Sequence, residues 1–311
     1  AKHSRSMREM GFALIGASIL LAVFIFVPSA QSVPGSQTSG STSSPQANTA
    51  SSTPDAFAQI QIEARAAVVY DLATDRILYE KNADAQLPLA SLTKLLTVYA
   101  ALAELSPTTP ITIPAGATTV EDAHTFRVGQ VFSLADLARL TLTASLNDGA
   151  VAIASATAER ENQTQGEMLA GAAASLGLSQ TFAVNGSGLD ASATVSGGYG
   201  SALDLARLAG ALVARASDIA MATTMRSAQA VSKGGTSFTV KTPDPIVANL
   251  PHRLLSKTGF TDLAGGNLAL VFDVGINHPV AVVILGSSLK ERFTDATTLI
   301  DATLAHFAGL Q

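Results

Sequence analysis

Apolar residues occur in short, nearly continuous runs at both ends of the region that follows residue 60. Two such runs within residues 66–82 flank a turn near residues 73–76, which predicts a β-hairpin. Further runs predict three more strands near the C-terminus, at 254–260, 266–274 and 279–287. Both ends of this region are therefore expected to contribute strands.

Between these strands the apolar residues recur at helical spacing. Residues 201–217 are the clearest case, because a serine opens the segment and the periodicity holds along its length. By the same criteria, further helices are predicted at 91–102, 133–144, 149–159, 167–177 and 291–307. This order predicts an α+β fold: an antiparallel sheet built from both chain ends, flanked by helices, with an inserted helical subdomain. A binding site is expected in the cleft between sheet and insertion.

The N-terminal part of the chain has a different character. Residues 11–27 contain no charge, whereas Lys2, Arg5 and Arg8 precede them. This arrangement predicts a short cytoplasmic basic segment, residues 1–10, followed by a transmembrane signal-anchor that leaves the rest of the chain outside. A cleaved signal peptide is the alternative, with the tripeptide "PSA" after the apolar stretch as a mediocre cleavage site.

A polar stretch separates this anchor from the rest of the chain. Residues 28–60 are rich in Ser, Thr, Pro and Gly, which cannot bury enough apolar surface to fold, so we expect a disordered linker. A flexible linker of that length spans about 30 Å on average. The folded domain is expected at residues 61–311, on the extracytoplasmic side of the cell membrane, which the chain would cross once.

Composition narrows the chemistry. The 311 residues carry a net charge of −5 and have no basic patch rich in aromatic residues, which argues against nucleic-acid binding. There is no cysteine, so disulfides and thiol catalysis are excluded. The five histidines are scattered without an H-E-x-x-H or H-x-H pattern, so a zinc hydrolase is not expected. No cofactor or metal is predicted.

The helix predicted at 91–102 begins with an unusual pair, Ser91 and Lys94. A serine at a helix start is often a cap, but a capping box would have Glu or Gln three residues later. A lysine there lies at the positive end of the helix dipole, where a disfavoured ammonium can become a base for a serine on the same face. The pair alone does not separate cap from nucleophile, since a second S-x-x-K, Ser287 to Lys290, has no function assigned.

Three motifs of this kind occur in order along the chain. They are Ser91-x-x-Lys94 at a helix start, Ser145-Leu146-Asn147 between two predicted helices, and Lys257-Thr258-Gly259 on a predicted strand. With surrounding stretches such as "ASLNDGAVAIA" and "KTGFTDLAGG", the chain from about Ala64 onward resembles the serine-type D-alanyl-D-alanine carboxypeptidases, the low-molecular-mass penicillin-binding proteins. The resemblance implies the β-lactamase/transpeptidase-like fold. It also implies peptidoglycan stem peptides ending in D-Ala-D-Ala as substrate and β-lactam antibiotics as covalent inhibitors.

The resemblance implies a catalytic role for three residues. Ser91 would attack the carbonyl of the penultimate D-alanine and form an acyl-enzyme. Lys94 would take the serine proton, for which it must be neutral; burial and a nearby Lys257 ammonium would both lower its pKa. Ser145 would connect the lysines to the leaving amine and pass the proton on.

The other matched residues would hold the substrate. Asn147 would hydrogen-bond the catalytic lysine and the substrate amide, while Lys257 and Thr258 would bind the terminal carboxylate. Gly259 would let the substrate backbone approach the strand. The backbone N–H of Phe260, with that of the nucleophile, would bind the oxyanion.

The chain departs from the family pattern beside two motifs. Leu146 stands where a small residue is usual, which is expected to narrow the cleft, and Ser256 stands where a small apolar residue is commoner. The chain ends at residue 311, soon after the third motif, so the additional C-terminal β-domain of some relatives is expected to be absent.

Two rival functions share the three motifs. A β-lactamase needs fast deacylation, commonly by a Glu in an E-x-x-L-N loop, and the stretch "AERENQTQGEMLAG" contains no such motif. A penicillin-binding sensor would have an inactive site, but all key side chains are present here. Endopeptidase and transpeptidase activity are not separated from carboxypeptidase activity by the sequence; small size and the resemblance favour the carboxypeptidase.

Overall fold

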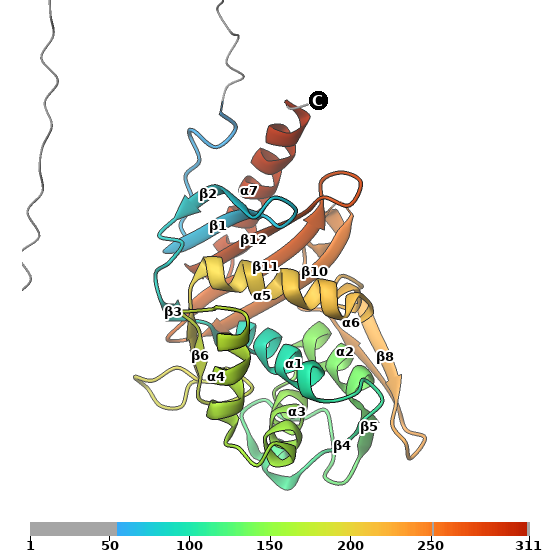
Figure 1. Ribbon diagram of the computed structural model, residues 1–311. Coiled ribbons are helices and arrows are strands. Elements are labelled where there is room, and N and C mark those ends of the chain that lie inside the picture. Colours follow the sequence, from blue (N-terminus) through green and yellow to red (C-terminus); the bar gives the residue numbers. More distant parts are fainter. Residues whose placement is uncertain (1–54, 251, 310–311) are drawn as a thin grey trace, which may run out of the picture. The chain divides into compact units, whose positions relative to one another are not determined.

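Five antiparallel strands form the main sheet in a computed structural model that describes residues 55–250 and 252–309. The strand order is β10-β11-β12-β1-β2, so the N-terminal hairpin extends a sheet made by the last three strands (Figure 1). Their bounds are β1 Ala66–Asp71, β2 Arg76–Lys81, β10 Arg253–Thr261, β11 Gly265–Asp273 and β12 Pro279–Ser287. The two chain ends meet where β1 pairs with β12, from Ala66 opposite Leu285 to Asp71 opposite Val280.

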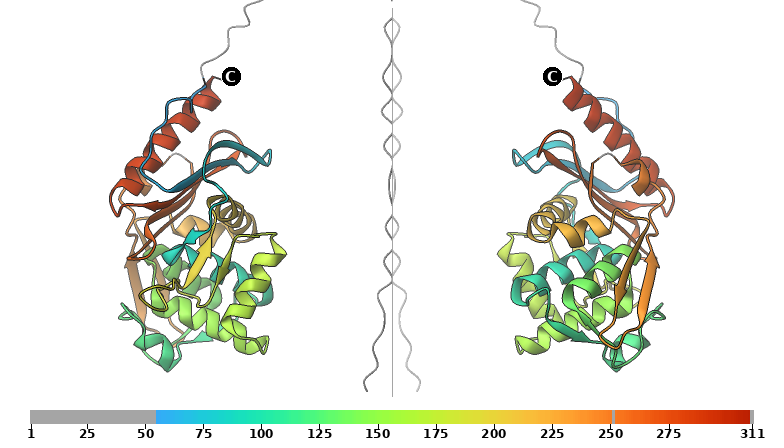
Figure 2. Two further views of the ribbon diagram at one scale, coloured as in Figure 1. Left: turned by 90° about the vertical axis from the view of Figure 1, so that its left-hand side faces the viewer. Right: turned by 90° about the vertical axis from the view of Figure 1, so that its right-hand side faces the viewer.

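Helices cover both faces of this sheet. α7 (Glu291–Ala308) lies against β11 and β12 on one face, and α5 (Ala202–Arg215) crosses β1 and β12 on the other (Figures 1 and 2). Successive residues of a strand point to opposite faces, so Val68 packs into the core on the α5 side and Val69 into the core beneath α7. This double burial explains why β1 reads as a continuous apolar run rather than an alternating one.

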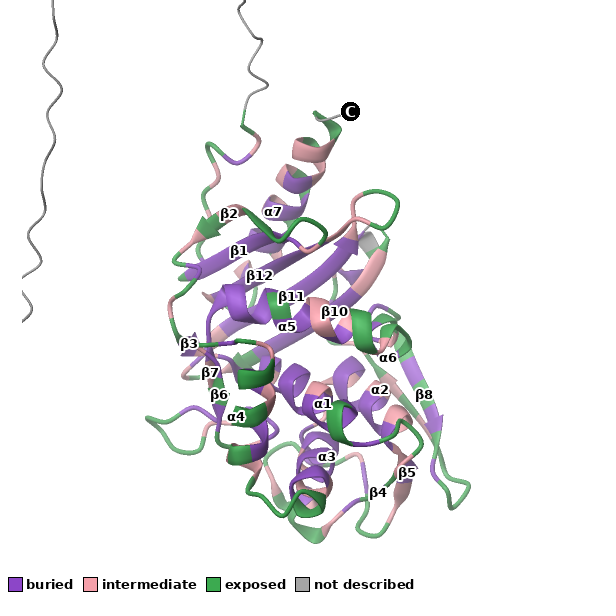
Figure 3. Ribbon diagram, in the orientation of Figure 1, coloured by how far each residue is buried: buried purple, intermediate pink, exposed green. Residues whose placement is uncertain are grey.

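The helical insertion packs on the α5 side of the sheet. Its helices are α1 Thr93–Glu104, α2 Leu134–Ala144, α3 Asn147–Arg160 and α4 Gln165–Ser175, and the short α6 Ser217–Ala222 follows α5. α1 is central, because it contacts α2, α3, α4 and α5, and it is largely buried (Figure 3). The predicted α+β architecture, with a sheet from both chain ends and an inserted helical subdomain, is confirmed.

Side-chain caps fix where several helices begin. The Ser133 hydroxyl accepts a hydrogen bond from the Asp136 N–H at the start of α2, as its position in the sequence predicts. Ser201 does the same at the start of α5. α4 starts earlier than the predicted residue 167, because Thr164 and Glu167 form a reciprocal capping box.

Several short elements were not expected from the sequence. They are β3 Leu87–Pro88, β4 Pro110–Thr112, β5 Val131–Ser133, β6 Phe182–Ala183, β7 Gly198–Gly200, β8 Ser227–Val231, β9 Ser237–Lys241 and the 3₁₀ turns η1 Ala90–Leu92, η2 Ala115–Thr119 and η3 Val247–Asn249. Strands of two or three residues are too short to show a period. The β8–β9 hairpin is longer, but the Ser, Ala and Gln residues of β8 have little strand propensity.

Part of the predicted organisation lies outside the described residues: the basic segment 1–10, the signal-anchor 11–27 and most of the linker 28–60. Within residues 55–250 and 252–309, every helix is too short or too polar to cross a membrane. Phe57 is buried between Tyr79 and His306 of α7, so the folded region takes in this residue of the predicted linker.

Candidate active site

Ser91 lies in the single turn of η1, which runs directly into α1 and packs against β10. The residue before it, Ala90, has a left-handed backbone with φ 48°. In this part of the structure no side chain caps η1 or α1, so Ser91 does not serve as a helix cap. Its hydroxyl oxygen instead lies 2.7 Å from Nζ of Lys94.

Lys94 is completely buried, and its amine has three partners. Nζ lies 2.8 Å from Oδ1 of Asn147, 2.7 Å from the carbonyl oxygen of Ser187 and 2.7 Å from the Ser91 hydroxyl. The first two partners can only accept, so a neutral amine donates its two hydrogens to them and keeps its lone pair for the Ser91 O–H. The contacts therefore fully satisfy Lys94 in the form that can act as a base.

Burial also favours the neutral form of this lysine. Desolvation lowers the pKa of Lys94 to about 7, and the nearby Asp148 carboxylate opposes part of that change. Asp148 itself is buried and accepts hydrogen bonds from the N–H groups of Thr125 and Phe126, which ties the segment before β5 to the start of α3.

The carbonyl of Ser187 comes from a tight turn at residues 185–189. Oδ1 of Asn185 accepts the N–H groups of Ser187 and Gly188, at 3.2 and 2.8 Å. Gly188 has φ 76°, and a Cβ on it would lie 1.9 Å from the carbonyl oxygen of Ala90. Only glycine lets this turn approach η1 closely enough to reach the Lys94 amine.

Ser145 and Asn147 flank the junction of α2 and α3. Ser145 ends α2 with φ 61°, and its hydroxyl accepts a 2.8 Å hydrogen bond from Nζ of Lys257. Asn147 donates from Nδ2 to the carbonyl of Glu121 while Oδ1 accepts from Lys94. The N-cap of α3 is Leu146, and no side-chain capping bond is found at this described junction, so neither Ser145 nor Asn147 caps α3.

Lys257 joins this network from β10. Its amine donates to Ser145 Oγ and, at 2.6 Å, to the carbonyl of Thr258. Burial, followed by the positive charges of Lys94 and Arg292, lowers the pKa of Lys257 well below its ordinary value, and Asp244 opposes the change.

The next residues of β10 form one wall of the site. Thr258 is buried at the cavity, whereas the Phe260 side chain is 46% exposed there. A Cβ on Gly259 would lie 3.0 Å from the Leu89 carbonyl and 3.2 Å from the Ser91 nitrogen. The close approach that this glycine allows is therefore between β10 and η1.

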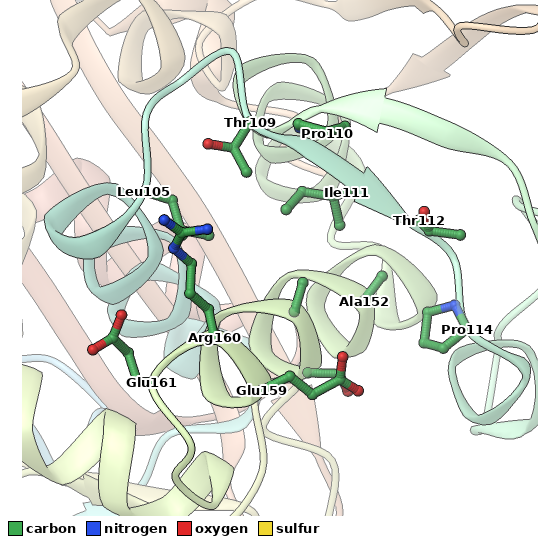
Figure 4. Close-up of a pocket in the computed structure, with 12 residues that line it drawn as sticks. Leu105, Thr109, Pro110, Ile111, Thr112, Pro114, Ala152, Glu159, Arg160 and Glu161 are labelled. Carbon is green, nitrogen blue, oxygen red and sulfur yellow. The ribbon is translucent and has the colours of Figure 1, made fainter.

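These residues surround a cavity of about 500 Å³ between sheet and insertion. Ser91, Ser145, Asn147, Thr258, Gly259 and Phe260 all line it, and Lys94 and Lys257 lie behind its wall and reach it through the two serines. A larger hollow of about 820 Å³ lies at the other end of the insertion, between β4 and α3 (Figure 4). It is lined by residues such as Thr109, Arg160 and Glu161 and by none of the predicted site residues.

One buried cation at the cavity was not predicted from the sequence. Arg292, in the first turn of α7, is 6% exposed and donates from Nη1 to the Gly259 carbonyl at 2.6 Å. Among the described atoms its Nε has no hydrogen-bond partner. The sequence contained a signal for this residue. Like Lys94, Arg292 is a cation in the first turn of a helix, where the helix dipole disfavours a positive charge.

Comparison with known proteins assigns the chain. A profile of the D-alanyl-D-alanine carboxypeptidase family, peptidase family S11, matches residues 48–288. The chain belongs to this family. The resemblance inferred from the three motifs is thus confirmed, and the chain is a member of the serine DD-peptidases.

Individual relatives of this S11 chain are named either as endopeptidases or as carboxypeptidases. The D-alanyl-D-alanine endopeptidase of Pseudomonas aeruginosa is 32% identical over 247 residues, which cover 78% of this chain and 77% of the relative. The D-alanyl-D-alanine carboxypeptidase DacF of Bacillus subtilis is 27% identical over 252 residues, which cover 79% of this chain and 63% of the relative. Carboxypeptidases and an endopeptidase are therefore both among its relatives.

Solved structures confirm the transpeptidase fold of this S11 chain. Penicillin-binding protein D2 from Listeria monocytogenes, in an ampicillin-bound form, has 25% identity and a TM-score of 0.66, covering 78% of this chain and 98% of that one. The D-alanyl-D-alanine carboxypeptidase from Mycobacterium tuberculosis H37Rv has 24% identity and a TM-score of 0.69, covering 79% and 92%. The roles of the individual site residues stay predictions, which the geometry above supports.

Proposed function

We propose that this DD-peptidase is a penicillin-sensitive carboxypeptidase that removes the terminal D-alanine from peptidoglycan stem peptides through an acyl-enzyme on Ser91. The observation that carries the proposal is the Lys94 amine, which is buried, satisfied as a neutral base and 2.7 Å from the Ser91 hydroxyl. A serine hydroxyl needs such a base, because it is a weak nucleophile while it keeps its proton.

Acylation would follow from the contacts around Ser91. Ser91 Oγ forms a bond to the carbonyl carbon of the penultimate D-alanine as its proton moves to Lys94 Nζ. When the peptide C–N bond breaks, the leaving amine of the terminal D-alanine takes a proton from the Ser145 hydroxyl, which in turn takes one from the Lys257 ammonium behind it. Water then attacks the ester, the proton path runs in reverse, and the shortened peptide leaves with Ser91 restored.

The developing oxyanion would be bound by the backbone N–H groups of Ser91 and Phe260. β10 is an edge strand of the five-stranded sheet, so alternate N–H groups of this strand face away from its only partner, β11. Rigid backbone donors of this kind stabilise a tetrahedral intermediate without reorganisation.

The terminal carboxylate of the substrate would bind where the cations gather. Lys257 and Thr258 approach from β10, and Arg292 adds a guanidinium whose Nε has no partner in the described structure. A β-lactam carries a carboxylate at the corresponding place, so the same groups would hold it while Ser91 opens the lactam ring.

We further propose that residues 11–27 anchor the chain in the cell membrane and that residues 28–54 tether the domain outside it, near the peptidoglycan. The uncharged apolar stretch after three basic residues supports this assignment.

The deciding test uses purified protein and the tripeptide diacetyl-Lys-D-Ala-D-Ala. We expect release of free D-alanine, loss of that release in Ser91→Ala, and its inhibition by penicillin. A folded protein that binds penicillin covalently but releases no D-alanine would instead be a sensor.

The endopeptidase is a second candidate, because the 32% identical relative bears that name. Cross-linked muropeptide dimers supplied to the same protein separate the two activities. Conversion of dimers to monomers at a rate above that of D-alanine release would assign the endopeptidase.

The β-lactamase alternative predicts a short-lived acyl-enzyme, whereas the proposed carboxypeptidase forms a long-lived one. We expect a penicilloyl adduct on Ser91 that persists for minutes in mass spectrometry, whereas rapid turnover of nitrocefin would assign a β-lactamase.

A further inference from the structure

A buried carboxylate lies behind the carboxylate-binding wall of the site. Asp244, in the segment between β9 and η3, is only 4% exposed. Its Oδ1 accepts the N–H of Ile246, and its Oδ2 accepts the hydroxyl of Ser256 at 2.5 Å. Ser256 is the residue directly before Lys257, at the position where the sequence departs from the family pattern.

Ser256 is held on two sides. Its N–H donates to Oγ1 of Thr223, which is buried at the end of α6, and its side chain is bound to Asp244. The contact therefore fixes the Asp244 carboxylate relative to the start of the K-T-G strand segment.

The buried cations of the site need a negative charge such as the Asp244 carboxylate nearby. Lys94, Lys257 and Arg292 are all at least nine-tenths buried, and their hydrogen-bond partners are uncharged. In the part of the chain that the structure describes, none of the three forms an ion pair. With Lys94 neutral as the base, Lys257 and Arg292 remain as two like charges buried together, and they repel one another strongly unless an anion lies within the same low-dielectric region.

The charged groups that act on Lys257 can be named. Lys94 on α1 and Arg292 on α7 lower the pKa of Lys257 beyond the effect of burial, and Asp244 is the carboxylate that opposes them. Asp244 opposes the lowering of the Arg292 pKa as well. The other charged residues on helices and strands packed against β10 are engaged elsewhere: Asp204 with Thr181, Arg207 with Tyr70, Arg215 with Leu102, Asp218 with Arg139 and Asp273 with His278.

We propose that Asp244, oriented by Ser256, is a positioning residue that keeps Lys257 protonated beside the Arg292 guanidinium, so that the two cations can bind the carboxylate of the substrate or of a β-lactam. The inference rests on the proposed function, because it assigns a purpose to the cations of that site. Asp244 touches neither substrate nor nucleophile; it acts through the two cations.

The consequence is a pH dependence on the alkaline side. Binding of the carboxylate requires the Lys257 ammonium, so acylation falls as pH rises through the pKa of this lysine. Replacing Asp244 by Asn removes the opposing negative charge and lowers that pKa further. The alkaline limb of the acylation profile should therefore move toward lower pH, by about one unit.

The test measures the rate of labelling by a fluorescent penicillin from about pH 5 to about pH 10, using the full chain in detergent. Asp244→Asn is compared with wild type and with the matched variant Asp301→Asn, whose carboxylate is exposed on α7. We expect the alkaline limb to shift only in Asp244→Asn, with the rate near neutrality changed less than at high pH. A loss equal at every pH, or an unmoved limb, would overturn the inference.

Two more variants cover the case in which Asp244→Asn does not fold. Asp244→Glu keeps the charge and should hold the limb at its wild-type position, while Ser256→Ala loosens the carboxylate and should shift the limb in the same direction by less. A wild-type limb in folded Ser256→Ala and a shifted limb in Asp244→Glu would contradict the proposal. Absence of any labelling of wild type would instead refute the proposed function.

Discussion

The hydrogen-bonding positions of Lys94 are all filled when its amine carries two protons. Oxygens of Asn147 and Ser187 take the two hydrogens, and the Ser91 hydroxyl faces the lone pair. A side chain in this environment is prepared to receive one proton from one direction, that of Ser91.

Replacing Lys94 by Arg should reduce acylation by penicillin about 10²–10⁴-fold, the usual loss on removal of a general base. The reason is that a guanidinium stays protonated at any working pH. Fluorescent-penicillin labelling of the folded variant measures the effect, with circular dichroism as the folding control. The matched variant Lys233→Arg, at an exposed position, should label like wild type. Near-normal labelling of Lys94→Arg would refute the assignment of the base.

The acid side of the pH profile should report Lys94 itself. Because its pKa is lowered to about 7, the neutral base is present above that pH and is lost below it. Acylation by a penicillin whose own carboxylate stays ionised should therefore fall about tenfold for each pH unit below about 7. Stopped-flow labelling across this range measures the limb, and a rate that is flat from weakly acidic to neutral pH would contradict the prediction.

Two non-glycine residues in or directly beside the sequence motifs have left-handed backbones, Ala90 with φ 48° and Ser145 with φ 61°. Such conformations cost free energy and persist where the surroundings enforce them. Ala90 aims Ser91 from η1, and Ser145 ends α2 beside Lys257. Backbone strain of this kind leaves no mark in the sequence, because neither residue is one that favours positive φ.

The sequence alone predicted the proposed catalytic and substrate-binding residues better than the residues that hold them in position. Ser91, Lys94, Ser145, Asn147 and Lys257 were found as motifs, and the structure brings them together. The supporting carbonyl of Ser187 is 93 residues from Lys94 and belongs to the backbone, so no side-chain pattern announces it. Asp148 and Asp244 were missed because their roles depend on contacts with other segments, which no motif shows, and Arg292 was missed although its place in a first helical turn was a signal.

At the scale of elements, long periodic segments were predicted well. The predicted strand 279–287 coincides with β12, and the predicted helices at 133–144 and 201–217 correspond to α2 and α5 with their serine caps. The short strands were not found, because β3 is defined only by its pairing with β7, which lies more than one hundred residues away. A two-residue strand has no pattern of its own.

The turn that carries Ser187 should tolerate no side chain at Gly188. Gly188→Ala combines a left-handed backbone with a Cβ overlapping the Ala90 carbonyl, so we expect destabilisation of at least about 2 kcal/mol. Gly171→Ala on α4 is the matched control: its Cβ meets open space, and the change should stabilise the helix by about 0.4–1 kcal/mol. Urea unfolding of both variants measures the difference, and equal effects would disprove the role given to this turn.

At the scale of the whole molecule, the described residues, 55–250 and 252–309, all belong to one compact unit. A fragment of residues 55–311 should therefore fold alone and react with penicillin at a rate within about twofold of the full chain. Cell fractionation should find the full chain with the membranes and the fragment in the soluble fraction. A fragment that is unfolded, or one that still sediments with membranes, would count against the separation into tether and domain.

The pairing of β1 with β12 also sets the order of events during synthesis. Val68 has its partner in Val283, so roughly ten to forty seconds of translation separate the two at about 5–20 residues per second. Throughout that interval the first strand, which is apolar on both faces, has an unpaired edge. The nascent chain therefore carries an exposed apolar strand edge for most of its synthesis, and a product that ends before β12 lacks the strand that covers this edge.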